Sequence, residues 1–372
     1  MGKIFGSRPG VVCACLLLVG CGAPSDETGE AVPDSAVARL DENHLLGEPI
    51  VAENLTVWPV FAEQPLEIGE FLTLNDAQTA DLAVVRELGD ATPSGATPTS
   101  IRHQRARVGK LEIENKGDLP ILVCAGTVVK GGNQDRQIAQ DFVVPPQSRV
   151  PVDAFCVERG RWSGRRHGER TKGLFLASRS MAPKSVRAMA QYEKNQGKVW
   201  EEVDAYVSQR ASEAAGTSLL LSIDAADATA RKVDQRLAQE VRAHFVTARE
   251  NGSAPVGFAY AIDGKPVTVR TFAHSRIFEN HFDIFLASMC MEADIAQRMA
   301  SRRQERKGQF EEASAEDVVA LVRALESYRE ELQATAAANL NGYRKGDLGF
   351  NSNCYLEQGN KQIALTQDWT AR

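Results

Sequence analysis

The chain has 372 residues, of which 43% are hydrophobic and 25% are charged, and its formal net charge is −6. This length and composition are typical of a globular protein that buries a substantial core. The acidic balance argues against a general nucleic-acid-binding protein, which normally presents a basic face, so we expect no nucleic-acid partner.

The N-terminus carries the most specific signal. Lys3 and Arg8 precede a ten-residue apolar run, residues 11–20, which is too short to cross a bilayer and has the length of a signal-peptide core. The run ends in Leu-Val-Gly-Cys at Cys21, which resembles the lipobox of bacterial lipoproteins. The resemblance implies cleavage before Cys21 and attachment of fatty acyl chains such as palmitate to this residue. The alternatives are an ordinary secretory signal and a short uncleaved anchor.

The residue after the lipidated cysteine bears on the location of the protein. Gly22 stands where an Asp favours retention in the inner membrane of enterobacteria. The resemblance therefore predicts a protein of the bacterial cell envelope, anchored by lipid to the outer membrane and facing the periplasm. Membrane contact through Cys21 is the first expected partnership, since several acyl chains hold a protein stably.

Four cysteines lie beyond Cys21. In an oxidising compartment they allow three disulfide pairings, and buried free thiols are the alternative. The sequence contains no Cys-x-x-Cys pair, so we expect neither a tetrahedral zinc site nor a thioredoxin-type redox site, and we assign no metal and no cofactor. These cysteines are Cys124, Cys156, Cys290 and Cys354.

Residues 21–46 are rich in Ala, Ser, Pro and acidic residues and predict a disordered tether, followed by a single α+β domain over residues 47–372. Pro59 predicts that the first strand lies at an edge or a bulge. Asn75 and Asp76 predict a helix cap, and residues 89–100 a polar loop. Short strands, mostly antiparallel, are predicted at 54–62, 71–74, 82–88, 108–114, 119–124, 142–144 and 148–156.

The second half alternates between blocks of helices and blocks of strands. Apolar residues recur at helical spacing over residues 183–207, where Gly197 divides the pattern, and over residues 225–249. Asp263-Gly264 predicts a tight hairpin turn. Blocks of like elements favour an α+β fold over alternating βαβ units. The remaining predictions are strands at 256–262 and 267–272, helices at 275–303 and 314–340, and a hairpin over 343–369.

The stretch from Cys124 to Trp162 combines glycines with side chains that recognise polar ligands. A guanidinium offers a planar fork to phosphate or carboxylate, an amide reads polar groups, and an indole gives a stacking surface. The combination suits a nucleotide or a sugar phosphate. The alternative is a bulged hairpin in which Arg136 pairs with Glu158 and Trp162 is core. The predicted ligand-binding residues are Gln134, Arg136, Glu158, Arg161 and Trp162.

Other chemistry-bearing patterns are weaker. The sequence has no phosphate-binding loop, no Gly-x-Ser-x-Gly elbow and no His-Glu-x-x-His pair. Cys156 would act as a nucleophile if a histidine lay beside it, but the nearest in sequence, His167, is in a basic Gly-rich loop typical of a surface. His274 and His281 are seven residues apart and lack a carboxylate at matching spacing, so a metal pair is disfavoured.

Several short motifs recur together in one known family. They are residues 71–74, 114–120, Gly126, Gly131, Gln134, Arg136, 144–145, 156–162, 196–200 and 257–264. Over about residues 54–293 the chain therefore resembles the ARG- and rhodanese-phosphatase-superfamily-associated protein domain family. These motifs are specific in combination and weak singly.

The family is of unknown biochemical activity. Its association with ADP-ribosyl-glycohydrolase and phosphatase-type proteins implies, by analogy alone, the handling of a nucleotide or of ADP-ribose. The chain departs from the family at Thr127, where an acidic residue is common, and at Asn133, where a lysine is common. If that acid were a catalytic base, its loss would favour binding over turnover.

Three hypotheses follow. The first is a lipid-anchored envelope protein whose domain binds a nucleotide-like or phosphorylated small molecule. The second is a hydrolase acting on a nucleotide or ADP-ribose-type substrate, with Glu158 as the base and Arg136 as the anion clamp. The third is a structural lipoprotein without a small-molecule site.

Overall fold

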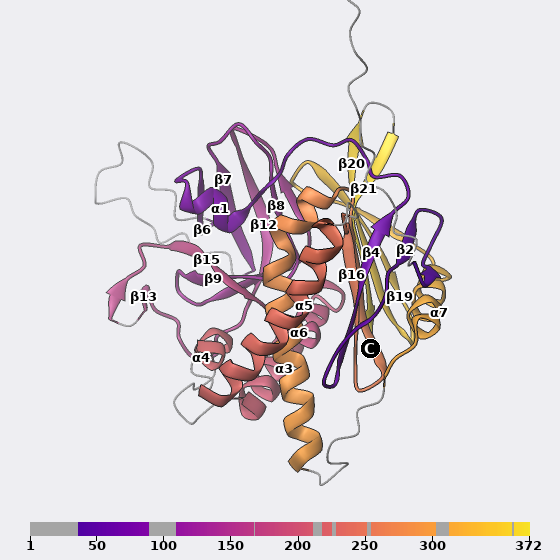
Figure 1. The fold of residues 1–372 in the computed structure, drawn as a ribbon. Coiled ribbons are helices and arrows are strands. Elements are labelled where there is room, and N and C mark those ends of the chain that lie inside the picture. Colours follow the sequence, from indigo (N-terminus) through magenta and orange to yellow (C-terminus); the bar gives the residue numbers. More distant parts are fainter. Residues whose placement is uncertain are drawn as a thin grey trace, which may run out of the picture.

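The computed structural model describes residues 36–88, 109–166, 168–210, 218–224, 228–250, 254–302, 312–358 and 361–372. The signal, Cys21, the loop at 89–100 and His167 lie outside these residues. Figure 1 shows a small barrel beside a large antiparallel sheet, with long helices packed over the junction. The mixed α+β class predicted from the sequence is confirmed.

The large sheet joins strands from both ends of the described chain to a hairpin from residues 257–272. Its buried side chains include Trp58, Phe258 and Trp369, each at most 1% exposed, which explains why strands far apart in the sequence stay together. Its strands, in spatial order, are β1 (Ala38–Arg39), β2 (His44–Leu46), β4 (Leu55–Ala62), β16 (Gly257–Ile262), β17 (Lys265–Phe272), β21 (Lys361–Ala371), β20 (Gly349–Gln358), β19 (Asn339–Lys345) and β18 (Glu331–Ala334), with β3 (Ile50–Ala52) also beside β4.

Two N-terminal features differ from expectation. Residues 38–46 fall in the expected tether, yet they form β1 and β2 and extend the sheet. Pro59 lies in the interior strand β4, at the break where β3 stops pairing and β2 begins. A proline is tolerated there because no neighbouring strand requires its missing N–H.

The barrel closes around apolar side chains such as Val85, Ile113, Val152 and Phe175. Its strands, in order, are β10 (Arg136–Ile138), β12 (Ser148–Cys156), β7 (Lys110–Asn115), β6 (Ala83–Glu87), β15 (Leu174–Met181) and β9 (Thr127–Gly131). A small sheet joins β11 (Phe142–Val144), β8 (Ile121–Val123) and β5 (Leu72–Thr73), and a separate hairpin joins β13 (Arg165–Arg166) and β14 (Glu169–Arg170).

The helices fill the space between the two β assemblies. The aromatic face of α6 packs on the large sheet, where Phe285 meets the rings of Phe258 and Phe272. None of the described helices is long and apolar enough to span a membrane. The helices are α1 (Leu74–Thr79), α2 (Lys184–Gln191), α3 (Gln196–Arg210), α4 (Leu219–Asp224), α5 (Ala228–Glu250), α6 (Ser275–Arg302) and α7 (Ala315–Glu326).

The local predictions have mixed outcomes. The Asp263-Gly264 turn is confirmed, with φ of 48° and 74° in a hairpin between β16 and β17. The cap of α1 is Thr73, whose side chain accepts from the Asp76 N–H, so the prediction of a cap at Asn75 and Asp76 is wrong. Helix α3 begins at Gln196, one residue before the glycine expected to divide the pattern.

The predicted helix over residues 314–340 is wrong beyond residue 326. Helix α7 begins with a capping box at Ser314 and Asp317 and ends at Glu326. The following residues form β18 and β19, which pair with each other and, through β19, with β20. Pairing with a long strand therefore overrides the helical preference of this segment.

Candidate functional site

The predicted ligand-binding residues gather at one end of the barrel, in two groups. In the first, Arg136 begins β10 and pairs with Cys156 and Val129 on the adjacent strands. Its Nη1 donates to Gln134 Oε1 at 3.2 Å and to Cys156 Sγ at 2.5 Å. Its Cζ lies 5.7 Å from the centre of the Trp162 ring, a cation–π contact. Trp162 is 54% exposed, so it is no core residue.

The second group is a closed network of charges. Arg161 Nε donates to both carboxylate oxygens of Glu158 at 2.8 Å, and the Asp135 N–H donates to Glu158 Oε2 at 3.0 Å. Glu158 is therefore held by Arg161, and not by Arg136 as the alternative interpretation supposed. Arg166 also binds the buried Asp135 carboxylate. Burial, with Glu158 nearby, raises the pKa of Asp135 despite the Arg166 hydrogen bond. These bonds hold the loop that follows β12 against the barrel.

The glycines of this stretch have a packing role. Gly131 and Gly132 have φ of 143° and 43°. A Cβ atom on Gly131 would lie 2.2 Å from the carbonyl oxygen of Leu174, and one on Gly132 would lie 2.1 Å from the Phe175 ring. Close approach to β15, and not to a ligand, accounts for both glycines.

A deeper polar cluster was missed by sequence reasoning. Arg270 on β17 is 1% exposed and donates to Asp141 at 2.6 Å and to Asp368 on β21 at 3.1 Å. Burial alone would lower the pKa of Arg270, but the two carboxylates raise it above its usual value. Asp141 also accepts from the Ala125 N–H at 2.7 Å, so this cluster joins the central stretch to the large sheet. The one sequence feature that could have indicated this cluster is a single arginine, Arg270, within the strand-like run Val-Thr-Val-Arg-Thr-Phe.

Cations line a narrow space next to this cluster. Arg187 on α2 is 7% exposed, and its guanidinium lies 5.7 Å from the Phe285 ring centre. The Arg187 side chain fits here because residue 126 is a glycine, with φ of 86°. A Cβ atom on Gly126 would lie 2.3 Å from Arg187 Cδ. Burial lowers the pKa of the neighbouring Lys184. Gln191 and Tyr192 close this space and also line the next cavity outward.

That outer cavity is a cleft of about 820 Å³ between the C-terminal end of α2, the link from α7 to β18, and β19. Lys194 Nζ lies 5.1 Å from the Tyr343 ring centre. Lys345 Nζ contacts Glu193 at 2.6 Å, whereas Arg329 has no ion pair among the described residues. Segments from distant parts of the chain supply the lining, so sequence reasoning missed this cleft. Its prominent side chains are Lys194, Arg329, Lys345, Arg372, Tyr328 and Tyr343.

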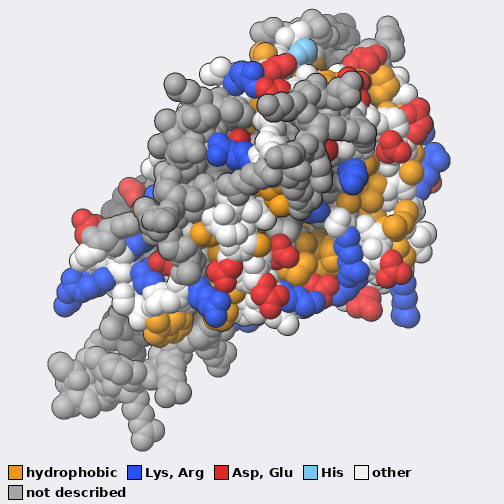
Figure 2. All heavy atoms as spheres, turned by 90° about the horizontal axis from the view of Figure 1, so that it is seen from below, with side chains coloured by type: hydrophobic (Ala, Val, Ile, Leu, Met, Phe, Trp, Pro, Cys, Tyr) orange, Lys and Arg blue, Asp and Glu red, His pale blue; other side chains and the backbone are white. Residues whose placement is uncertain are grey.

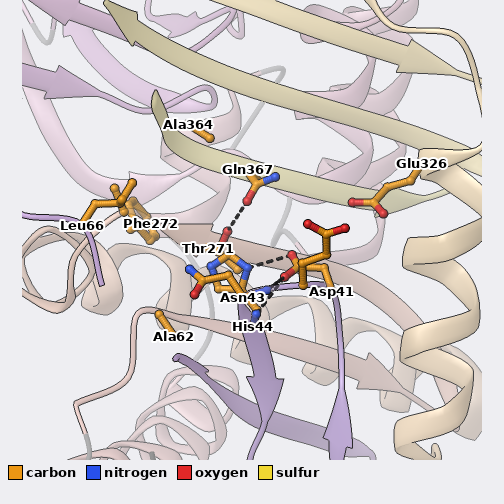
Figure 3. A pocket seen from close by; sticks show the side chains of 12 residues that line it. Asp41, Asn43, His44, Ala62, Leu66, Thr271, Phe272, Glu326, Ala364 and Gln367 are labelled. Atoms are coloured by element: carbon orange, nitrogen blue, oxygen red, sulfur yellow. Dashed lines mark hydrogen bonds and ion pairs between the residues drawn. The ribbon is translucent and has the colours of Figure 1, made fainter. Parts of the chain in front are cut away.

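A second cavity, of about 390 Å³, lies near the start of the sheet and carries the opposite charge (Figure 3). Asp41 Oδ1 accepts from the N–H groups of Asn43 and His44 at 2.8 Å each, and Asp41 Oδ2 lies 2.7 Å from His44 Nδ1. Glu326 reaches the same space from the end of α7 (Figure 3). Burial and then the charge of Asp41 raise the pKa of Glu326.

The surface seen in Figure 2 carries basic and acidic side chains interspersed among apolar ones, with no single sign dominating its described residues. Cys124, Cys156, Cys290 and Cys354 are buried free thiols, the second of the two states allowed by the sequence. Burial raises the pKa of Cys124 to about 12. No three His, Cys, Asp or Glu side chains in the described ranges are placed to hold a metal ion.

The two histidines considered as a metal pair have separate partners. His281 is buried on α6, with Nδ1 at 2.8 Å from the Ile277 carbonyl oxygen and Nε2 at 3.2 Å from that of Leu122. His274 Nδ1 accepts from the Arg276 N–H at 3.1 Å, just before the helix. Both rings therefore stabilise the local fold.

Comparison with known families matches residues 43–356 to the ARG and Rhodanese-Phosphatase-superfamily-associated Protein domain. The match covers well over half of the chain, and the protein belongs to this family. The family resemblance expected from the sequence is thereby confirmed, over a longer range than expected. No curated protein and no solved structure matches the chain significantly.

Proposed function

We propose that this protein is a lipid-anchored envelope protein whose domain binds an anionic small molecule in the cleft between α2, β18 and β19. The observation that supports this proposal is the convergence of four basic side chains and several tyrosines on one cavity of about 820 Å³. A cavity of that size accommodates a nucleotide or a sugar phosphate.

The lining fits that ligand class. Arg329 and Arg372 offer planar donors to a phosphate or carboxylate, and Lys194 offers a point charge. Tyr328 and Tyr343 offer ring faces and hydroxyl groups to a base or a sugar. Arg329, which has no ion pair among the described residues, is the side chain best placed to receive the anion without breaking an existing contact.

The cluster at the barrel end is a second candidate for the same ligand class. Arg136 and the exposed Trp162 stack there, as a phosphate-binding pair with an aromatic platform would. However, both Glu158 oxygens already accept hydrogen bonds, and Arg161 donates to Glu158 and to the Gly132 carbonyl. The polar groups of this cluster are already hydrogen-bonded to one another, so these bonds must break before the cluster can bind a ligand. The cleft between α2, β18 and β19 is already open.

The hydrolase hypothesis has less support. It requires Glu158 to accept a proton from substrate or water. Glu158 is 8% exposed and is bonded to the Arg161 guanidinium, which stands between the carboxylate and a substrate. We therefore propose binding without turnover.

Titration calorimetry with AMP and adenosine tests the cleft. AMP should bind the wild type, and adenosine should bind much more weakly because it lacks the phosphate. Arg329→Gln should weaken AMP binding by roughly 1.5–3 kcal/mol, the contribution of a charge-assisted hydrogen bond. Arg136→Ala should leave it unchanged. Loss of binding in Arg136→Ala alone would move the site to the barrel end, and equal affinity for adenosine would reject an anion site.

The anchor needs its own test. The sequence around Cys21 supports acylation at that residue. In cells fed a palmitate analogue, the wild-type protein should become labelled and fractionate with the outer membrane. Cys21→Ala should be unlabelled. Labelling that persists in Cys21→Ala would refute this anchor and would leave the cleft proposal untouched.

A further inference from the structure

The four cations that line the cleft between α2, β18 and β19 differ in their partners. Lys194 contacts the Tyr343 ring, and Arg329 has no ion pair among the described residues. The other two cations, Lys345 and Arg372, share a single carboxylate, that of Glu193. Half of the positive charge of the cleft is therefore already neutralised by the protein itself.

Glu193 lies in the link between α2 and α3 and holds both cations through one oxygen. Its Oε1 atom lies 2.6 Å from Lys345 Nζ and 3.8 Å from Arg372 Nη2. Its Oε2 atom lies 3.1 Å from the Nζ atom of Lys198, which does not line the cleft. The Oε1 atom thus occupies a position between two cations that an oxygen of a bound phosphate or carboxylate would also favour.

The ion pairs of Glu193 are accessible to water. Hydrogen bonds from Lys345 and then from Lys198 lower the pKa of Glu193, so its carboxylate is ionised at neutral pH. The side chains of Lys345 and Arg372 are each 48% exposed. Ion pairs at this exposure are weak, because water screens them. An anion in the cleft can therefore take the two cations over from Glu193 at little cost.

This exchange requires side-chain movement only. The backbone of the link is held by Tyr192, whose ring stacks on that of Phe350 with the ring centres 4.4 Å apart. When the two cleft cations turn toward a ligand, Glu193 keeps Lys198 as its partner through Oε2. The carboxylate is therefore paired in both arrangements, and neither arrangement leaves it without a cation.

We propose that Glu193 is an internal competitor for the ligand of the cleft and that it sets the affinity of this site. Without a ligand, Glu193 neutralises Lys345 and Arg372. An anion bound at Arg329 draws these two cations to itself, and Glu193 retains Lys198. The proposal rests on the anion-binding function proposed above and adds that the protein restrains its own affinity.

Titration calorimetry with AMP tests the competition, because loss of the Glu193 charge should strengthen binding. Glu193→Gln preserves the shape of the side chain and should lower the dissociation constant of AMP about threefold, the contribution of an exposed ion pair. Glu331→Gln is the matched control. It removes a carboxylate that lines the cleft and has no ion pair among the described residues, so it measures the general effect of one negative charge and should lower the dissociation constant less.

Two more variants identify the contact responsible. Lys345→Gln removes one of the cations that Glu193 holds, so adding Glu193→Gln to it should improve AMP binding by a smaller factor than in the wild type. Glu193→Asp has a shorter side chain that holds Lys345 less closely, and it should also lower the dissociation constant. This variant keeps the test available if Glu193→Gln fails to fold.

The outcomes separate this proposal from the anion cleft on which it rests. An unchanged or raised dissociation constant in Glu193→Gln, or an equal decrease in Glu331→Gln, would overturn the competition. If Arg329→Gln weakens AMP binding while Glu193→Gln leaves it unchanged, the cleft stands and only the competition is refuted. If neither the wild type nor Glu193→Gln binds AMP, the cleft is refuted and the competition with it.

Discussion

At the scale of single residues, Asp41 shows how local bonds set a charge. Its carboxylate accepts two backbone hydrogen bonds and one from His44. Burial alone would raise the pKa of Asp41, but the hydrogen bond and charge of His44 lower it overall. A lowered carboxyl pKa stabilises the folded state above the ordinary value of 3.8, and that stabilisation is lost as the pH falls through the lowered pKa.

Asp41→Asn should therefore destabilise the protein by about 1–2 kcal/mol at pH 7, because the amide replaces a charged acceptor. The difference from the wild type should shrink as the pH falls from 3.8, the ordinary pKa of the carboxyl group, toward the lowered pKa of Asp41, because the unfolded wild-type chain takes up a proton in that range and the folded protein does not. Urea unfolding at several pH values measures this. A difference that stays constant down to pH 3 would show that the charge of Asp41 is irrelevant.

At the scale of elements, the sequence correctly predicted those turns and strands that depend on residues close together in the chain. The Asp263-Gly264 hairpin follows from turn chemistry, and the strand predicted at 108–114 follows from its alternation of apolar and polar residues and is β7. The segment after α7 was predicted as a helix because its residues favour one. It forms β18 and β19 because β20, further along the chain, offers a partner, which no local pattern reveals.

Gly126 gives a prediction at this scale. Gly126→Ala should cost about 2–4 kcal/mol, because a side chain at φ of 86° is strained and its Cβ would overlap Arg187 on α2. Gly168→Ala is the matched control. Gly168 has φ of 85° but has nothing within 4 Å of its Cβ position, so this variant should cost about 1 kcal/mol. Equal costs in urea unfolding would mean that the contact between Gly126 and α2 is unimportant.

At the scale of the whole molecule, the barrel and the large sheet share one buried ionic centre. Arg270 on β17 contacts Asp141, which follows β10 of the barrel, and Asp368 on β21. The side-chain amides of Asn339 and Asn341 donate to the Asp141 carbonyl, each at 3.0 Å. The central stretch singled out in the sequence is therefore attached to the C-terminal strands through a residue, Asp141, that its motifs did not highlight.

Removing the arginine should weaken this junction strongly. Arg270→Met leaves two buried carboxylates without their cation and should destabilise the protein by about 3–5 kcal/mol. Arg276→Met removes an exposed arginine, paired with Glu70, and should cost less than about 1 kcal/mol. Tryptophan fluorescence during urea unfolding compares the two. Similar midpoints would contradict the role assigned to Arg270.

The same scale explains what sequence reasoning missed in the candidate sites. Gln134, Arg136 and Trp162 were predicted to lie together because they flank one pair of strands, and Arg136 contacts both of the others. The cleft draws Lys194 from α2's end and Arg329 from the α7–β18 link, positions related only by the folded sheet. Residues brought together by distant strands carry no shared spacing in the sequence.

A crystal structure of the protein soaked with AMP tests the proposed function most directly. We predict density for the phosphate within hydrogen-bond distance of Arg329, with the rest of the nucleotide against Tyr328 or Tyr343. Density beside Arg136 and Trp162 instead, or an empty cleft at an AMP concentration that saturates binding in solution, would contradict it.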